Sequence, residues 1–339
     1  KMMISKTKLY IWLGILAIVL LFGFFKFARR SIEISNTGEK PAGLLQFFSS
    51  GKKENIKKSP LTGEQCATAA SRPFAVMVSS DKEARPLSGI GEADWVFEMP
   101  VVENGFTRMM AVYQCGRPRE VGSVRSARLD FVPLALGVNA IYAHFGGERE
   151  ALEQLRNGVI DNLDGLKYDG TYYYRKSSIP RPHNAFTDFD LLTKISGELG
   201  YNLTDAKVTY PHEGSLKSQG EVQPAPIFNE KFQVVWRYDK TANRYWRERS
   251  GQPEIDKNTG QPVSAGNVII MKTTWSPINQ DYIRVKTVGS GGLLLYKNGT
   301  VVTGTWEKKD DKAKLYFYDQ NHREIELAVG KVWVEIDAH

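Results

Sequence analysis

The sequence predicts an α+β protein in which an N-terminal transmembrane helix precedes an α/β domain and a mainly β C-terminal domain. Three observations lead to this fold class. A long uncharged apolar run lies near the N-terminus, short apolar runs then alternate with stretches of helical spacing, and many short β-branched and aromatic runs follow. We expect a transmembrane anchor over residues 1–30, a linker over 31–60, and two domains over 61–215 and 216–339.

The composition excludes several classes of protein. The 339 residues are 42% hydrophobic and 24% charged, which excludes disordered, collagen-like and low-complexity chains. A net charge of +7 is compatible with an anionic partner but does not demonstrate one. Two cysteines are too few for a structural zinc site. Nucleotide-binding, zinc-protease and redox motifs are missing from the sequence, so we predict no cofactor and no metal.

The predicted anchor is the uncharged run Leu9–Phe25. Spanning a bilayer core takes roughly 17–25 apolar residues, so we interpret this run as a membrane span in preference to a buried core helix. Neither a cleavage site nor a cysteine follows it, so we expect neither a cleaved signal peptide nor lipidation there. Basic residues flank the run almost equally. The short N-terminal tail favours a single-pass cell-membrane protein with its body on the extracytoplasmic side.

The first domain combines strands and helices. Four apolar runs predict strands, namely Phe74–Ser79, Asp94–Met99, Thr107–Gln114 and Ala140–Phe145. Helical spacing predicts a helix over 148–156. A capping-box-like motif at 187–190 predicts a second helix that ends at Gly200.

The second domain is predicted to be mainly β. Its short runs are separated by turn residues, and they are Phe232–Tyr238, Val268–Lys272, Tyr282–Val288, Leu293–Tyr296, Val301–Trp306, Lys314–Tyr318 and Lys331–Ile336. Asn298-Gly299 lies between two of these runs and predicts a type I′ hairpin.

Three polar clusters in the first domain are candidate binding segments. The first contains Arg125, Ser126 and Arg128, and its arginines share one face if a helix begins there. Guanidinium groups suit carboxylate or phosphate ligands, although a pair of surface or ion-paired arginines is the alternative. The second cluster contains His144, Gly146 and Gly147 between a strand and a helix, where backbone N–H groups are available to an anion. A hydrogen-bonded structural histidine is the alternative there.

The third cluster is the loop 175–184, which two prolines stiffen. It carries Arg175, His183 and Asn184, and it is either a functional loop or a purely structural one. Glu103 lies in a turn and could supply a carboxylate to His144 or His183 for acid–base chemistry.

Cys66 and Cys115 are the candidate disulfide. They could bridge in an oxidising compartment, or they could remain two free thiols.

Several segments, in the same order, resemble the YerB-like family of bacterial envelope lipoproteins. In the first domain they are RPFAVMVSS at 72–80, ARPLSGIGEADWVFE at 84–98, ENGFTRMMAVYQ at 103–114, VGSVRSARLDFV at 121–132, AIYAHFGG at 140–147 and RPHNAFTD at 181–188. In the second they are AGNVIIMKT at 265–273, VGSGGLLLYKNG at 288–299, TGTWEK at 303–308 and VGKVWVEI at 329–336. The resemblance implies a two-domain, membrane-attached bacterial protein without an established reaction.

Two functional hypotheses follow from these observations. The first is a membrane-anchored cell-envelope protein of unassigned activity, which binds an anionic envelope ligand or a protein partner through its arginines. The second is a hydrolase of an anionic envelope polymer, with His144 or His183 as the base. A nucleic-acid partner is not favoured, because the positive charge is spread along the chain.

Overall fold

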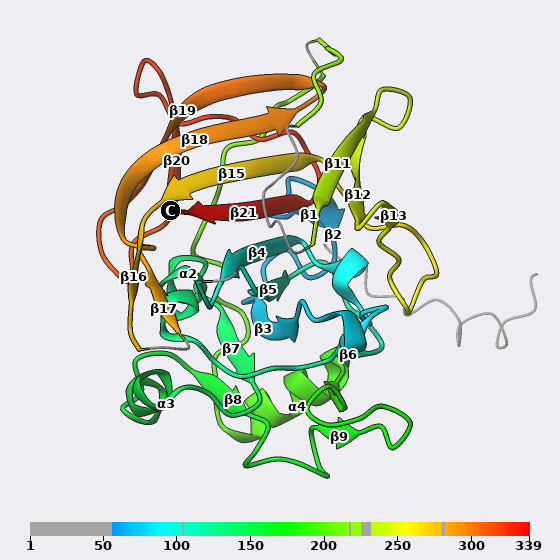
Figure 1. Cartoon of the computed structure of the whole chain (residues 1–339), viewed down its shortest axis with the longest axis vertical. Coiled ribbons are helices and arrows are strands. Elements are labelled where there is room, and N and C mark those ends of the chain that lie inside the picture. The colour runs from blue at the N-terminus through cyan, green and yellow to red at the C-terminus, as the bar shows by residue number, and fades with distance from the viewer. Residues whose placement is uncertain (1–55, 104, 217, 225–231, 280–281) are drawn as a thin grey trace, which may run out of the picture. The chain divides into compact units, whose positions relative to one another are not determined.

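The computed structural model describes residues 56–339 except 104, 217, 225–231 and 280–281, and these residues are mostly β-structure (Figure 1). The strands are β1 (Lys57–Lys58), β2 (Gln65–Cys66), β3 (Phe74–Ser79), β4 (Trp95–Pro100), β5 (Thr107–Tyr113), β6 (Val121–Gly122), β7 (Ile141–His144), β8 (Asn162–Asp164), β9 (Tyr174–Arg175), β10 (Ala185–Thr187), β11 (Val234–Asp239), β12 (Arg244–Arg249), β13 (Gln252–Pro253), β14 (Ser264–Ala265), β15 (Asn267–Thr273), β16 (Trp275–Pro277), β17 (Ile283–Val285), β18 (Gly289–Lys297), β19 (Thr300–Lys308), β20 (Tyr316–Asp319) and β21 (Val332–Ala338). The helices are α2 (Val132–Gly137), α3 (Arg149–Arg156) and α4 (Phe189–Glu198), with 3-10 turns η1 (Lys82–Ala84), η2 (Ile90–Glu92) and η3 (Leu129–Phe131).

One ten-stranded sheet organises the described chain, in the order β20-β19-β18-β15-β21-β4-β5-β3-β7-β8. The C-terminal strand β21 pairs in parallel with β15 on one side and with β4 on the other. Figure 1 shows β21, in red, between the two. Strands from both sides of residue 216 therefore belong to a single sheet.

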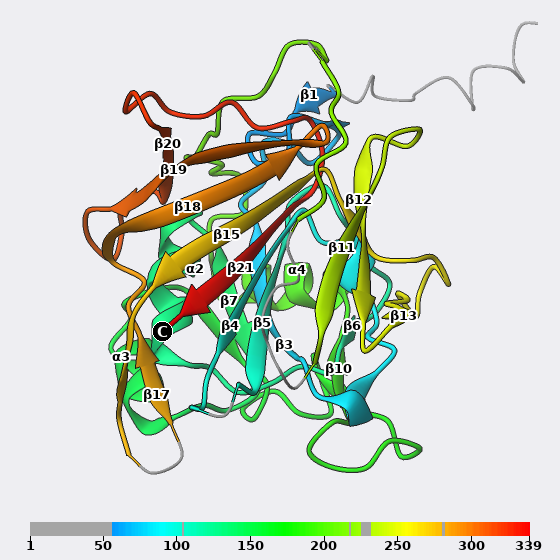
Figure 2. The same ribbon diagram turned by 45° about the horizontal axis from the view of Figure 1, so that its top comes forward.

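Both faces of this sheet are buried. Along β3, Ala75 and Met77 enter one hydrophobic core, while Phe74 and Val76 enter the other, because side chains alternate along a strand. Helices α2 and α3 contribute apolar residues to the first core. Helix α4 and strands β11 and β12 contribute to the second, and Figure 2 shows β11 and β12 beside the main sheet.

The predicted α+β class is wrong, because the described chain is mostly β with few helices. The longest of its α-helices, α4, has 10 residues. In the part of the chain that the structure describes, no helix is long and apolar enough to cross a membrane. The run Leu9–Phe25, over which the N-terminal transmembrane helix was predicted, lies outside the described residues. Local patterns predicted about half of the described strands and missed β12, and the pairing of distant strands places ten of the strands in one sheet.

Several individual elements are confirmed. Strand β3 has the predicted bounds, and α3 and α4 lie where helices were expected. The cap of α4 is Asp188, whose carboxylate accepts a hydrogen bond from the Leu191 N–H at 2.7 Å. Asn298 and Gly299 connect β18 and β19 with φ of 51° and 65°, as a type I′ turn requires.

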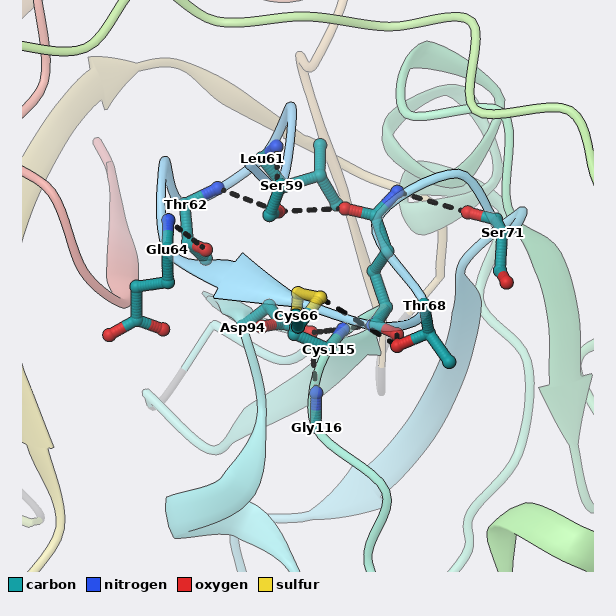
Figure 3. The surroundings of a disulfide bond; sticks show 11 residues. Ser59, Leu61, Thr62, Glu64, Cys66, Thr68, Ser71, Asp94, Cys115 and Gly116 are labelled. Carbon is teal, nitrogen blue, oxygen red and sulfur yellow. Dashed lines mark hydrogen bonds between the residues drawn. A yellow bond between two sulfur atoms is a disulfide. The ribbon is translucent and has the colours of Figure 1, made fainter. Parts of the chain in front are cut away.

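A disulfide between Cys66 and Cys115 ties β2 to the residues that follow β5 (Figure 3). The two Cα atoms are 5.8 Å apart. Beside the bond, one carboxylate oxygen of buried Asp94 accepts hydrogen bonds from the N–H groups of Gln114, Cys115 and Gly116. Burial raises the pKa of Asp94, while the hydrogen bonds from these three N–H groups lower it by a smaller amount.

Candidate functional site

One edge of the large sheet brings together polar residues that are distant in sequence. Strands β3 and β4 end there and β5 begins there, because β5 is antiparallel to both. The extended segment after β6 crosses this edge, where the Arg125 N–H donates to the Met77 carbonyl at 2.9 Å. Asp81 follows β3 and Arg108 is the second residue of β5, so both lie at the same edge as Arg125.

Two neighbouring cavities lie here, and together we call them the arginine cleft. The larger has a volume of about 380 Å³ and is lined by Asp81, Val101, Val102, Phe106, Thr107, Arg108, Arg125, Ser126, Arg128 and Tyr282. The smaller has a volume of about 220 Å³ and is lined by Val124, Arg125, Ser126, Phe145, Arg175, Arg181 and Pro182. Arg125 and Ser126 belong to both walls, so the cavities adjoin.

Positive charge exceeds negative charge in the larger cavity. Its lining, which consists of described residues, contains Arg108, Arg125 and Arg128 but only one carboxylate, Asp81. One oxygen of Asp81 lies 3.6 Å from Arg108 Nη1 and 3.8 Å from Arg125 Nη2. Ser79 Oγ donates a 2.7 Å hydrogen bond to the same oxygen. A single carboxylate therefore faces two guanidinium groups at distances longer than hydrogen bonds.

Several guanidinium donors in the cleft are buried without a hydrogen-bond partner among the described residues. They are Nε and Nη1 of Arg108, Nε of Arg125 and Nε of Arg128. Arg108 is only 7% exposed. Unpaired buried donors are uncommon in proteins, and a buried charge without a counter-charge is costly. An anion beside these arginines would add negative charge to the one carboxylate, Asp81, that lies near Arg108 and Arg125.

The pKa shifts reflect the same surroundings. Burial, then the positive charges of Arg125 and Arg128, lower the pKa of Arg108 to about 9. Arg108 therefore still carries its charge at neutral pH. Burial, then Arg125, lower the pKa of His183, which favours the neutral imidazole at neutral pH. A bound anion would oppose both shifts, because it favours the charged form of each group.

The first and third predicted clusters meet in the cleft. Arg125, Ser126 and Arg128 lie in an extended segment, so the helix considered for them does not begin there; η3 and then α2 follow it. Arg125 Nη1 donates to the Pro182 carbonyl at 2.9 Å, which ties this segment to the 175–184 loop.

The loop itself holds its polar residues in different ways. His183 Nδ1 lies 3.8 Å from Asp81, which lines the larger cavity, but His183 itself lines neither cavity. Arg175 donates to Asp169 and to the side chain of Asn184, and its guanidinium lies over the Phe145 ring. Asn184 is thus buried, accepts a hydrogen bond from Arg175 and lines neither cavity.

The remaining candidates lie elsewhere. His144 is fully buried, and its ring nitrogens contact the Gly146 carbonyl at 2.8 Å and the Asn162 side chain at 3.3 Å. The Gly146 N–H donates to Asp164, and a Cβ at Gly147 would approach Ala127 and Leu152 closely. Glu103 is exposed in the turn after β4. None of these four candidates lines either cavity.

Sequence reasoning did not select Arg108, Asp81 or Arg181. The sequence signal for Arg108 is its charge, because the other residues of strand 107–113 are uncharged. Asp81 offered no comparable signal, because its importance depends on the approach of Arg108 and Arg125 from distant segments.

Comparison with known proteins assigns the chain to a family. Models described as the N-terminal and C-terminal domains of a protein of unknown function (DUF3048) match residues 61–202 and 225–334. The chain is 33% identical to "Putative lipoprotein YerB" of Bacillus subtilis (strain 168), over 82% of this chain and 86% of that protein. The crystal structure of the YerB protein from Bacillus subtilis matches with a TM-score of 0.73 and 30% identity, covering 83% of this chain and 96% of that one. The chain belongs to the YerB-like (DUF3048) family.

Proposed function

We propose that this protein acts in the bacterial cell envelope, where it binds an anionic ligand in the arginine cleft. The supporting observation is a cavity lined by three arginines and one carboxylate, in which each arginine also has a buried donor without a hydrogen-bond partner among the described residues. Charge-assisted hydrogen bonds from such donors favour phosphate or carboxylate groups. The cavity of about 380 Å³ is within the usual range for small-molecule sites.

The envelope location is supported by the relative and by the disulfide. A protein with which this chain shares 33% identity is named a putative lipoprotein. Disulfides such as Cys66–Cys115 persist mainly in oxidising compartments. We infer a membrane-associated protein with its folded body outside the cytoplasm. Protease added to intact spheroplasts should digest that body, and protection of the body would contradict this location.

The binding proposal is tested by calorimetric titration of the full-length chain with inorganic phosphate at low ionic strength. Arg125→Ala should weaken binding by about 1.5–3 kcal/mol, the range for a hydrogen bond to a charged group. Arg323→Ala is the matched control, because Arg323 is an exposed arginine near β20 and lines neither cavity.

Thermal unfolding of the same variants without phosphate separates binding from stability. We expect Arg125→Ala to unfold close to the wild-type temperature. A loss of about 3–5 kcal/mol in stability with unchanged phosphate affinity would identify Arg125 as one half of a structural ion pair and overturn the proposal.

A second candidate function, hydrolysis of an anionic envelope polymer, is supported by His183. Its buried Nδ1 has no hydrogen-bond partner among the described residues and lies 3.8 Å from Asp81. A neutral imidazole beside a bound anion could accept a proton from water. His183→Gln should then abolish product release from a phosphodiester substrate while phosphate still binds. Absence of turnover by the wild-type protein would leave binding alone as the function.

A further inference from the structure

The two cavities of the arginine cleft differ in their chemistry. The larger is lined by Arg108, Arg125 and Arg128, each of which also has a buried donor without a hydrogen-bond partner among the described residues. The smaller has an apolar wall made by Val124, Phe145 and Pro182, with arginines at its border. A ligand that occupied both cavities would therefore meet charge, then apolar surface, then charge.

The arginines of the smaller cavity are not equivalent. Arg175 is neutralised by Asp169, whose carboxylate accepts from its Nε at 2.8 Å, and it lies 4.4 Å from the centre of the Phe145 ring. It is thus part of the wall. Arg181 is exposed and forms no ion pair with the residues that the structure describes. Its charge is available to a ligand at the outer end of the cleft.

Arg125 is the link between the cavities. It lines both, and its Nη1 donates to the Pro182 carbonyl at 2.9 Å, which holds the guanidinium in place at their junction. Together the cavities offer about 380 and 220 Å³, more than a single phosphate group needs.

We propose that the arginine cleft binds a polyol-phosphate chain, with one phosphate among Arg108, Arg125 and Arg128 and the next phosphate at Arg181. The carbon atoms between the phosphates lie against Phe145 and Pro182. This inference rests on the proposed function and adds the class of ligand. It follows from the alternation of charged and apolar surface, because a compact anion would use only the larger cavity.

The test compares three ligands on the full-length chain by calorimetry: glycerol 3-phosphate, a phosphodiester-linked trimer of glycerol phosphate, and tripolyphosphate. The trimer should bind wild-type protein at least about tenfold more tightly than glycerol 3-phosphate, because it reaches both cavities. Tripolyphosphate has the charges without the carbon atoms and should bind more weakly than the trimer. Tighter binding of tripolyphosphate would overturn the assignment to a polyol phosphate.

Two variants locate the ligand. Arg181→Ala should remove most of the trimer's advantage and leave glycerol 3-phosphate affinity unchanged. Arg128→Ala should weaken both ligands by a similar factor, and Arg323→Ala should change neither. Equal effects of Arg181→Ala on both ligands, or none on the trimer, would overturn the two-subsite inference while the proposed function stands. Failure of the wild-type protein to bind inorganic phosphate or any of the three ligands would instead refute the proposed function.

Discussion

At the residue scale, Asp81 has opposite effects on stability and on ligand binding. Its carboxylate supplies the negative charge nearest to Arg108 and Arg125, so it offsets part of their mutual repulsion in the folded protein. The same carboxylate repels an anion that enters the larger cavity. Asp81 therefore stabilises the protein without ligand and weakens the binding of phosphate.

Asp81→Asn should raise phosphate affinity roughly threefold to tenfold, which corresponds to about 0.7–1.4 kcal/mol. It should also lower the unfolding temperature in the absence of phosphate, because the arginines lose their counter-charge. Calorimetry and thermal unfolding measure the two effects on one variant. Weaker phosphate binding by Asp81→Asn would show that the carboxylate organises the ligand site and does not compete with the ligand.

At the element scale, two connections fix how neighbouring segments of the chain lie against one another. The Cys66–Cys115 disulfide fixes β2 to the end of β5, with 49 residues of sequence separation. The Asn298-Gly299 turn fixes β18 against β19. A Cβ on Gly299 would lie 2.4 Å from a ring carbon of Tyr238, and φ there is positive, so glycine is required for two separate reasons.

Replacing both cysteines with serine should reduce the free energy of unfolding by about 2–4 kcal/mol, since the unfolded chain gains conformational freedom. Urea denaturation measures the loss. The wild-type protein in reducing agent should then unfold like the double variant. Thiol labelling of the unfolded, unreduced wild-type protein should detect no free thiol, and two labelled cysteines would contradict the bond.

Gly299→Ala should destabilise the protein by about 2–4 kcal/mol, the sum of a left-handed backbone and a steric clash. Gly251→Ala is the matched control, because Gly251 has a φ of 73° but open space around its Cα. The control should lose only about 1 kcal/mol. Equal losses in urea denaturation would show that backbone conformation alone accounts for the requirement.

At the scale of the whole molecule, a buried ion network joins β4, β12 and β21. Arg247 is fully buried and pairs with Glu98 at 2.6 Å and with Glu254, while Glu335 lies 3.7 Å from its Nε. Trp236 Nε1 donates to Glu335 at 3.1 Å. Burial, then the negative charge of Glu98, raise the pKa of Glu335 to about 8. Arg247 already pairs with Glu98 and Glu254, so it offsets only part of the negative charge of Glu335.

The raised pKa of Glu335 predicts a pH dependence of stability. An unfolded glutamate loses its proton near pH 4.3, while the folded protein keeps it until about pH 8. Between these values the folded state binds the extra proton, so its stability falls as pH rises. Glu335→Gln lacks this titration. We expect the stability of wild type relative to Glu335→Gln to decrease from pH 5 to pH 8 in urea denaturation, and a constant difference would contradict the assignment.

The candidate site shows which part of the function could be predicted from sequence. Arg125, Ser126 and Arg128 were found because they stand in one short polar motif. Arg108, the second residue of β5, and Asp81, two residues after β3, belong to no such motif, and only the fold brings them together. Gly146 and Gly147 are predicted to bind an anion through their backbone N–H groups, but the Gly146 N–H donates to the Asp164 carboxylate instead. Local motifs do not show which donors are already occupied.

The sequence by itself determined the longer strands except β12, helices α3 and α4 and the β18–β19 turn, because apolar periodicity, caps and turn residues act within a few positions. It also offered one possible cysteine pair. Only the tertiary structure decided that β21 joins β15 to β4 in one sheet, and that Asp81, Arg108 and Arg125 meet at its edge. Such contacts depend on the pairing of strands far apart in the chain, and many pairings bury similar apolar strands equally well.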